Sequence, residues 1–170
     1  MKTFLLALGF ALICVSSQVD PEEITGEWRT ILMGADDLEK VSEDSDMRVR
    51  FRHLECIDAC EKLAVTFYVK SNGECQKFSV VSTKGPHDVF EVEYAGQNFF
   101  QIEYFSKGII IFYNIHVDGN GKVTHMTNVG AKEDSLSEEH KKKFEEVTVA
   151  SKIPKENIRN VIETDDCPAA

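Results

Sequence analysis

Two cysteines four residues apart, Cys56 and Cys60, are the first residues in this chain whose spacing could support chemistry. Thiols placed in this way could bind a metal, take part in redox exchange or form a disulfide. A structural zinc site needs about four clustered cysteine or histidine ligands, and no second closely spaced cysteine pair accompanies this one. The histidines are spread along the chain without a visible cluster, at His53, His87, His116, His125 and His140. The sequence therefore predicts neither a bound metal nor a cofactor.

Residues 1–17 bear on how the cysteines behave, because they have the pattern of a secretory signal peptide. A basic residue, Lys2, precedes an apolar run over residues 4–15 and two small residues, Ser16 and Ser17. The run is shorter than the roughly 20 residues that cross a membrane, and no later segment reaches that length. We expect cleavage after Ser17, with cleavage after Ser16 as the alternative, and an extracellular protein.

Four cysteines remain after this cleavage: Cys56, Cys60, Cys75 and Cys167. In an oxidising compartment an even number favours two disulfides, for which three pairings exist. Proximity favours Cys56–Cys60, which leaves Cys75–Cys167. Four residues of extended chain span about 13 Å, whereas bridged Cα atoms lie within about 7 Å, so the first bridge requires a tight bend.

Charge and motif content exclude several functions. The chain has 29 acidic against 19 basic residues and a formal net charge of −10. An acidic protein is repelled by phosphate backbones and anionic membranes, so we expect no nucleic-acid partner and no membrane partner. Neither of two common motifs of hydrolases and metalloproteases, Gly-x-Ser-x-Gly and His-Glu-x-x-His, occurs. The segment 118–121 begins like a calcium-binding EF-hand loop, but Val123 and Val129 stand where that loop requires glycine and glutamate. These features predict a protein that is not an enzyme.

Most of residues 46–130 alternates between apolar and polar side chains, which is typical of half-buried β-strands. The clearest segment, residues 47–52, places three arginines opposite three apolar side chains. Turn pairs such as Asn72-Gly73 and Lys107-Gly108 separate the segments. With a strand at Trp28–Gly34, the pattern predicts an all-β fold of eight antiparallel strands in up-and-down order, which can close into a barrel.

The doubly apolar segment 109–115 needs a cover on its outer side, and the residues after the predicted barrel supply one. Ser135 and Glu138 could form a capping box. An apolar stripe at helical spacing follows, made by Leu136, His140, Phe144, Val147 and Ser151. We therefore expect one domain over residues 18–170, with a barrel over about 26–132, a helix over about 135–152 and a tail that a disulfide pins at Cys167.

Several short motifs resemble the lipocalin family. Gly26-Glu27-Trp28, just before the first predicted strand, is similar to the Gly-x-Trp motif of that family. Other segments resemble the mammalian odorant-binding and aphrodisin-like branch, namely 37–40, 55–60, 94–98, 114–118, 153–158 and 164–168. The resemblance extends over nearly the whole chain after the signal peptide. It implies an eight-stranded up-and-down lipocalin barrel with one C-terminal α-helix packed outside.

The resemblance also assigns structural roles. Gly26 and Trp28 would close the bottom of the barrel, and Lys132 would pack over the indole ring where the family commonly has arginine. Lysine still permits a cation–π contact at this position. The Cys-x-x-x-C spacing is typical of the odorant-binding branch, so the Cys56–Cys60 pair is interpreted as a structural disulfide.

Matching to the same branch, strand by strand, implies a ligand pocket inside the barrel. Alternation independently places residues 47, 49 and 51 on one face, as it does 92 with 94 and 112 with 114. The expected pocket residues are Met33, Met47, Val49, Phe51, Val65, Phe67, Val92, Tyr94, Asn98, Phe100, Phe112, Asn114, Met126 and Asn128. Our hypothesis is that Asn114, helped by Tyr94 or Asn98, donates to a ligand carbonyl or hydroxyl; alternatively, these side chains bond each other or water.

Together these features favour a secreted carrier of small hydrophobic volatile ligands, either odorants or pheromones. Two alternatives stay open. The protein itself could be a chemosensory signal that a receptor reads, or it could transport larger lipids such as fatty acids or retinoids. The pocket positions contain no cationic residue, which argues against carboxylate cargo. We expect a monomer or a weak homodimer.

Overall fold

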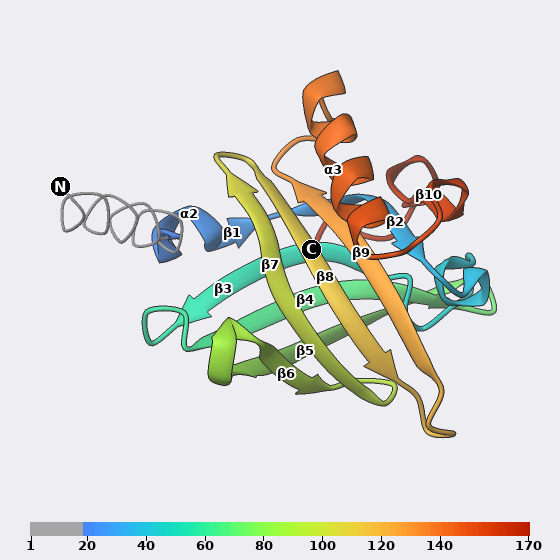
Figure 1. The fold of residues 1–170 in the computed structure, drawn as a ribbon, viewed down its shortest axis with the longest axis horizontal. Helices are drawn as coiled ribbons and strands as arrows, with labels where there is room; N and C mark the ends of the chain where they lie inside the picture. Colours follow the sequence, from blue (N-terminus) through green and yellow to red (C-terminus); the bar gives the residue numbers. More distant parts are fainter. Residues whose placement is uncertain (1–18) are drawn as a thin grey trace, which may run out of the picture.

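The computed structural model describes residues 19–170 (Figure 1). The predicted signal peptide, residues 1–17, and its cleavage site lie outside the described residues. The described chain forms one curled antiparallel sheet, with helix α3 (Glu138–Ala150) packed against its outside. A short helix, α2 (Pro21–Ile24), precedes the sheet. Among residues 19–170, no helix combines the length and the apolar character needed to cross a membrane.

The described residues contain ten strands, in the spatial order β1-β3-β4-β5-β6-β7-β8-β9-β2-β10. From β3 to β9 each strand pairs with its successor along the chain, as expected for a meander with short connections. The strand bounds are β1 (Gly26–Glu27), β2 (Arg29–Ala35), β3 (Arg50–Ile57), β4 (Lys62–Ser71), β5 (Glu74–Lys84), β6 (Phe90–Glu93), β7 (Gln97–Ser106), β8 (Ile109–Val117), β9 (Val123–Ala131) and β10 (Ile158–Asn160).

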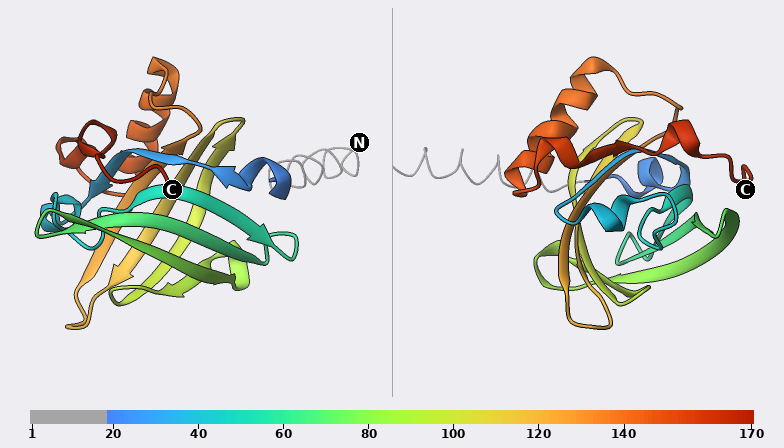
Figure 2. Two further views of the ribbon diagram at one scale, coloured as in Figure 1. Left: turned by 180° about the vertical axis from the view of Figure 1, so that it is seen from behind. Right: turned by 90° about the vertical axis from the view of Figure 1, so that its right-hand side faces the viewer.

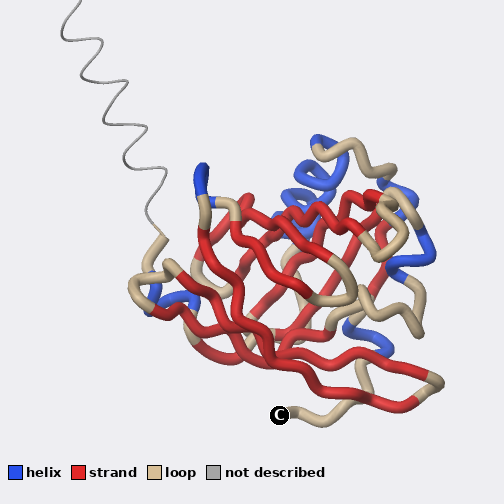
Figure 3. The backbone as a smooth tube through the Cα atoms, turned by 90° about the horizontal axis from the view of Figure 1, so that it is seen from below, coloured by secondary structure: helices blue, strands red, loops and turns tan. Residues whose placement is uncertain are grey.

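The N-terminal strand segment closes the sheet into a barrel. Strand β1 pairs with β3 at one end of the meander, whereas β2 pairs with β9 at the other end. Only Trp28 separates β1 from β2, and its backbone N–H donates to the Arg52 carbonyl at 3.1 Å. Figures 2 and 3 show the strands wrapped around a common interior. The predicted all-β, up-and-down barrel with one outer C-terminal helix is confirmed.

Two strand predictions need correction. Strand β3 begins at Arg50 and not at residue 47, because its ladder with β4 starts at the Arg50–Tyr68 pair and the preceding chain turns through Ser45. In the tail, for which no strand was predicted, β10 pairs with β2. A strand of three residues is too short to show alternation, so only its neighbour in space reveals it.

Helix α3 starts later than its predicted capping box. Ser137 is the N-cap, and its Oγ accepts a hydrogen bond from the backbone N–H of His140 at 3.1 Å. The assignment of Ser135 as the cap is wrong, since Ser137 still has extended backbone angles of −67° and 161°. Glu138 is therefore the first helical residue and does not occupy the third helical position that a capping box requires.

The buried face of α3 explains why β8 is apolar on both sides. Phe144 is fully buried and belongs to the same cluster as Ile109 and Ile111, which point outward from β8. Thr148, which the predicted stripe omits, is also fully buried, and its hydroxyl lies 2.8 Å from that of Thr127 on β9. The helix is therefore held to the barrel by one apolar cluster and one buried hydrogen bond.

The alternating arginines before and within β3 are buried, although alternation places them on the outer face. Arg48, Arg50 and Arg52 are 5%, 0% and 5% exposed. Arg52 makes two hydrogen bonds to Asp165 in the C-terminal tail, and Arg50 bonds Glu43 at 2.8 Å. The tail thus covers a face of the barrel that a period-2 pattern would leave in solvent.

Candidate functional site

An apolar cavity of about 100 Å³ lies inside the barrel. The structure brings all fourteen predicted pocket residues onto its wall, from Met33 on β2 to Asn128 on β9. Eleven of them lie on strands, where alternation turns their side chains inward, while Met47, Val49 and Tyr94 lie in the chain next to β3 and β6. Whether these residues contact a ligand remains a prediction, while their convergence on one cavity is a structural result.

Two residues of the cavity wall were absent from the predicted set. Val80 lies opposite Val65 in the β4–β5 ladder, and its alternation with Phe78 was the signal that could have identified it. Thr127 also borders the cavity. Its hydroxyl bonds Thr148 on the helix side, and no sequence pattern separates it from an ordinary outward residue.

Aromatic rings form much of the wall. The ring of Tyr94 meets those of Phe67 and Phe78 edge-on, with centroids 4.9 and 5.3 Å away. Phe112 makes similar contacts with Phe51 and Phe100, at 5.8 and 5.7 Å. Such edge-to-face pairs add about 0.5–1.5 kcal/mol each beyond area burial, so they hold the shape of the cavity.

The polar residues of the wall include three asparagines besides Tyr94 and Thr127. Asn114 Nδ2 donates to Asn98 Oδ1 at 3.0 Å, and Asn98 Nδ2 donates to the Tyr94 carbonyl at 2.9 Å. One of the two N–H groups of Asn114 is therefore used inside the protein. This arrangement matches the alternative in which the side chains bond each other. It leaves the second N–H group of Asn114 for the hypothesised bond to a ligand, which stays a prediction.

The hydroxyl of Tyr94 ties the cavity wall to a loop. It donates to the carbonyl of Asp46 at 2.7 Å, in the segment 42–49 that also supplies Met47 to the cavity. Burial, together with the nearby charge of Asp46, raises the pKa of Tyr94 above its usual range, so the phenol stays protonated as a donor. This bond holds the loop against the cavity.

Trp28 is 1% exposed and lies where the N-terminal segment joins both edges of the barrel. Its Nε1 donates to the Ile24 carbonyl at 2.6 Å, and Lys132 Nζ lies 4.3 Å from the centre of its ring. Gly26 has a φ of +143°, and a Cβ there would lie 2.7 Å from Lys132 Nζ. The three residues assigned to closure of the barrel are thus in mutual contact at one place.

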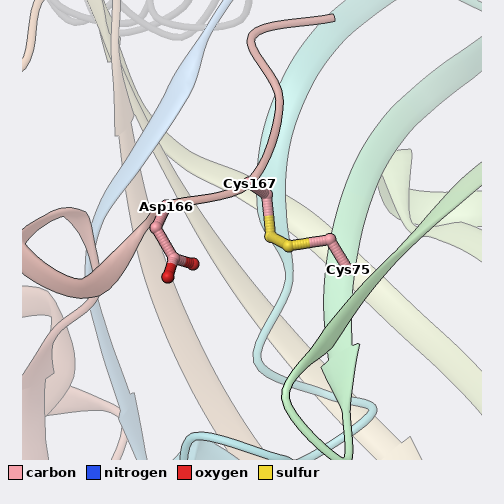
Figure 4. A group of neighbouring side chains, drawn as sticks. All are labelled: Cys75, Asp166 and Cys167. Atoms are coloured by element: carbon pink, nitrogen blue, oxygen red, sulfur yellow. A yellow bond between two sulfur atoms is a disulfide. The ribbon is translucent and has the colours of Figure 1, made fainter.

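Four cysteines form two disulfides in the described chain. Cys56 and Cys60 are joined across a tight turn with Cα atoms 4.3 Å apart, and Asp58 and Ala59 within it have positive φ angles. Cys75 of β5 is joined to Cys167, which attaches the tail to the barrel (Figure 4).

Asp166 lies close to this second disulfide, so three residues with metal-ligand atoms come together there (Figure 4). Both sulfurs, however, are bonded to each other and supply no thiolate. The Asp166 carboxylate instead pairs with the ammonium group of Lys70, which lowers the pKa of Asp166. This group of residues therefore does not have the chemistry of a metal site.

Comparison with known proteins supports the sequence-based resemblance. Residues 25–165 match the lipocalin / cytosolic fatty-acid binding protein family. Lipocalin Cav p 2.0101 of Cavia porcellus is 39% identical, over 99% of both chains. The odorant-binding protein of Rattus norvegicus is 32% identical, over 98% of both chains.

Solved structures have the same architecture. The crystal structure of aphrodisin, described as a sex pheromone from female hamster, superimposes with a TM-score of 0.83 at 36% identity, over 85% of this chain and 99% of aphrodisin. A complex of bovine odorant-binding protein with undecanal has a TM-score of 0.65 at 30% identity, over 89% and 97% of the two chains. Because the barrel, its closure and the similarity to these relatives extend over nearly the whole described chain, this protein belongs to the lipocalin family.

Proposed function

We propose that this protein is a secreted carrier that binds small hydrophobic volatile ligands, either odorants or pheromones, inside its barrel. The observation that supports this most directly is the apolar cavity of about 100 Å³ in the barrel interior. Most of the affinity would come from burying apolar ligand surface, at about 25 cal/mol per Å² before the costs of association. The bovine odorant-binding protein with a similar fold binds undecanal, a small apolar aldehyde.

The size of the cavity favours volatiles over long lipids. An apolar cavity of about 150 Å³ is large enough for benzene. The cavity of about 100 Å³ is smaller than that, so even a small ligand requires adjustment of flexible side chains such as Met33, Met47 and Met126. A fatty acid or a retinoid would require a much larger rearrangement of the aromatic wall.

The remaining features of the proposal carry over the expectations from the sequence. Residues 1–17 would be removed on secretion, which leaves a single domain over 18–170 that is a monomer or a weak homodimer. Lipocalins are generally carriers, and we propose that this one has no catalytic activity. Its four described cysteines are all in disulfides, so none of them is a free thiol that could act as a nucleophile. A chemosensory receptor is the second partner that we propose, because aphrodisin is described as a sex pheromone.

Displacement of a fluorescent apolar probe tests the proposal on recombinant 18–170 with both disulfides verified. We expect micromolar displacement by volatile alcohols, aldehydes and ketones, and weak displacement by long-chain fatty acids or retinol. Preference for the long lipids would instead indicate a general lipid transporter. Absence of probe binding, with chemosensory activity of the delipidated protein, would indicate that the protein itself is the signal.

A matched pair of variants locates the binding site. Val80 borders the cavity, whereas its neighbour Val81 is 54% exposed on the outer face of the same strand. Val80→Phe should fill much of the cavity and abolish probe binding, while Val81→Phe should leave it unchanged. Equal effects of the two substitutions would place the probe elsewhere.

A further inference from the structure

The connection between β2 and β3, residues 36–49, lies at the end of the barrel opposite Trp28. It follows the last residue of β2, whereas Trp28 precedes the first. Its later part, segment 42–49, supplies Met47 and Val49 to the cavity wall, and Met47 is only 5% exposed. Segment 42–49 therefore covers the cavity at this end of the barrel.

The same segment is bonded to the far side of the barrel mouth. The Tyr94 hydroxyl donates to the Asp46 carbonyl at 2.7 Å. Tyr94 follows β6, whereas Asp46 precedes β3, and β4 and β5 lie between these two strands in the sheet. In a closed barrel, strands separated in this way lie on different sides of the interior. A ligand in the cavity therefore cannot leave through this end unless segment 42–49 moves.

One carboxylate, that of Glu43, joins the segment to the body of the protein. Its Oε1 lies 2.8 Å from Arg50 Nη2 and 3.3 Å from Lys70 Nζ. Its Oε2 lies 3.3 Å from Arg48 Nη2 and accepts a hydrogen bond from the Thr164 hydroxyl at 3.0 Å. Arg50 belongs to β3, Lys70 to β4 and Thr164 to the C-terminal tail. A single side chain thus attaches the segment to three parts of the fold.

These bonds involve an ionised carboxylate and buried cations. Burial alone would raise the pKa of Glu43, but hydrogen bonds from Thr164 and Lys70, together with two nearby guanidinium groups, lower it below its usual range. The side chain of Arg50 is 0% exposed, whereas that of Glu43 is 42% exposed. Charge-assisted bonds are about twice as strong as neutral ones. The exposed carboxylate also leaves them open to screening by salt.

We propose that Glu43 is a positioning residue for ligand retention, which holds segment 42–49 closed over the cavity and thereby sets the rate at which a ligand leaves. This role rests on the carrier function proposed above. A neighbouring ion pair, Asp37–Lys122, attaches the first part of the connection to the β8–β9 turn. Within the described chain, every ion pair of residues 42–49 includes Glu43, so the covering part depends on this carboxylate.

The first test measures the release of N-phenyl-1-naphthylamine, an uncharged fluorescent probe, when its complex is mixed with excess toluene in a stopped-flow instrument. Glu43→Gln keeps the size of the side chain and removes its charge. The probe should leave this variant about fivefold to tenfold faster, as expected for the loss of about one net hydrogen bond. Asp44→Asn is the matched control, because Asp44 is the next residue, is exposed and carries the same charge. It should release the probe at the wild-type rate.

Salt provides a readout that a purely steric role of Glu43 would not change. The probe is uncharged, so salt acts on its release through the protein. From about 0.01 M to about 1 M salt, the screening length falls from about 30 Å to about 3 Å. Wild type then loses part of an attachment that Glu43→Gln already lacks, so the ratio of their release rates should fall at least about twofold. A ratio that does not change with salt would contradict an ionic attachment.

A second pair of variants makes a smaller change to the same attachment. Thr164→Val removes the hydroxyl that donates to Glu43, whereas Thr164→Ser retains it. Release should be about twofold to threefold faster from the valine variant and close to wild type from the serine variant. Equal release from both variants would contradict the part of the tail in holding the segment.

Hydrogen exchange of the ligand-free protein reports on the segment without any ligand. The backbone N–H of Arg48 donates to the Ser45 carbonyl at 3.1 Å, and that of Glu61 donates to the Asp58 carbonyl at 3.0 Å in the β3–β4 turn. Exchange at Arg48 should be about fivefold to tenfold faster in Glu43→Gln, while exchange at Glu61 stays as in wild type. Equal acceleration at both amides would indicate a general loss of stability and would overturn the proposed role.

The outcomes separate the role of Glu43 from the carrier function. Release and exchange at wild-type rates in Glu43→Gln would overturn this role and leave the carrier function intact. Equal acceleration of release in Asp44→Asn would trace the effect to charge in general and would overturn it as well. A wild-type protein that binds no probe would instead refute the carrier function, while exchange at Arg48 would still show whether Glu43 holds the segment.

Discussion

Replacement of Asp165 by asparagine should destabilise the protein severely. The side chain of Asp165 is 0% exposed in its ion pairs with Arg29 and Arg52. Arg52 donates to both carboxylate oxygens, at 2.8 and 2.7 Å, and Arg29 donates to Oδ2 at 3.0 Å. Asp165→Asn keeps the shape of the side chain but removes the negative charge that the two guanidinium groups share.

The expected loss follows from the asymmetry of buried ion pairs. Removing one partner leaves the other charge uncompensated, which typically costs about 3–5 kcal/mol. Asparagine retains one acceptor oxygen for Arg52 or Arg29, so we expect the lower end of that range, about 3 kcal/mol. Since domains of this kind have a total unfolding free energy of about 5–15 kcal/mol, this is a large fraction.

Urea unfolding followed by the fluorescence of Trp28 measures the effect, because that indole is buried at the barrel closure. The matched control is Asp134→Asn. Asp134 also pairs with Arg29, at 3.7 Å, but its side chain is 78% exposed. Exposed pairs contribute about 0–1 kcal/mol, so this variant should unfold close to wild type. Both changes remove one negative charge, and an equal loss of stability in the two variants would refute our account of the buried network.

The dependence on pH gives a second measurement of the same interaction. Burial alone would raise the pKa of Asp165, but hydrogen bonds from Arg52 and Arg29 outweigh it and lower the pKa below its usual range. A carboxylate with a lowered folded-state pKa stabilises the protein above the unfolded-state pKa of about 3.9 and loses this contribution as the pH falls toward the folded value. The stability difference between wild type and Asp165→Asn should therefore be full near pH 7 and should narrow below about pH 4. A constant difference across that interval would contradict the assignment.

Three further changes have defined outcomes. Replacing Cys75 and Cys167 together by alanine should lower the unfolding free energy by about 4 kcal/mol in urea titrations, because their disulfide closes a long loop with a sequence separation of 92. A loss under about 1 kcal/mol would show that other contacts hold the tail without the disulfide. Tyr94→Phe removes the hydrogen bond to the Asp46 carbonyl, which is worth about 1 kcal/mol. It should speed ligand dissociation about fivefold in stopped-flow displacement, without a matching change in the association rate. An unchanged dissociation rate would mean that the 42–49 loop does not limit the escape of the ligand. Lys132→Met removes the cation over the indole ring and should cost about 0.5–1 kcal/mol in thermal or urea unfolding, whereas a gain in stability would contradict a favourable cation–π contact.

Local patterns in the sequence were sufficient to predict most of the barrel. Alternation shows directly on which side of the sheet the side chains of residues such as Val92 and Phe112 lie, because successive side chains of a strand point to opposite sides. Once the strands close around one interior, inward positions must meet, which is why the residues that alternation placed inward, 47, 49, 51, 92, 94, 112 and 114, border one cavity. The other seven predicted pocket residues were implied by the resemblance to the lipocalin family. Val80 follows the same rule and could have been included.

Local patterns failed where a distant segment decides the environment. The arginines Arg48, Arg50 and Arg52 alternate as solvent-facing residues would, but all three are buried. The folded tail contacts Arg48 and Arg52, and Glu43 contacts Arg50. Strand β10 exists because the edge of β2 is available to it. The cap of α3 at Ser137 was missed because several serines precede the helix, and backbone geometry chooses among them.

The sequence by itself determined the order of the meander from β3 to β9, the inward faces and the apolar character of the interior, because these depend on periodicities of two residues and on turns between neighbours. Only the tertiary structure decided how the amide side chains inside the barrel are oriented. The orientation of the Asn114 amide depends on Asn98, and that of Asn98 depends on the backbone carbonyl of Tyr94. An amide offers a donor on one side and an acceptor on the other with nearly the same shape, so its direction is set by partners in space and leaves no trace in the residue type.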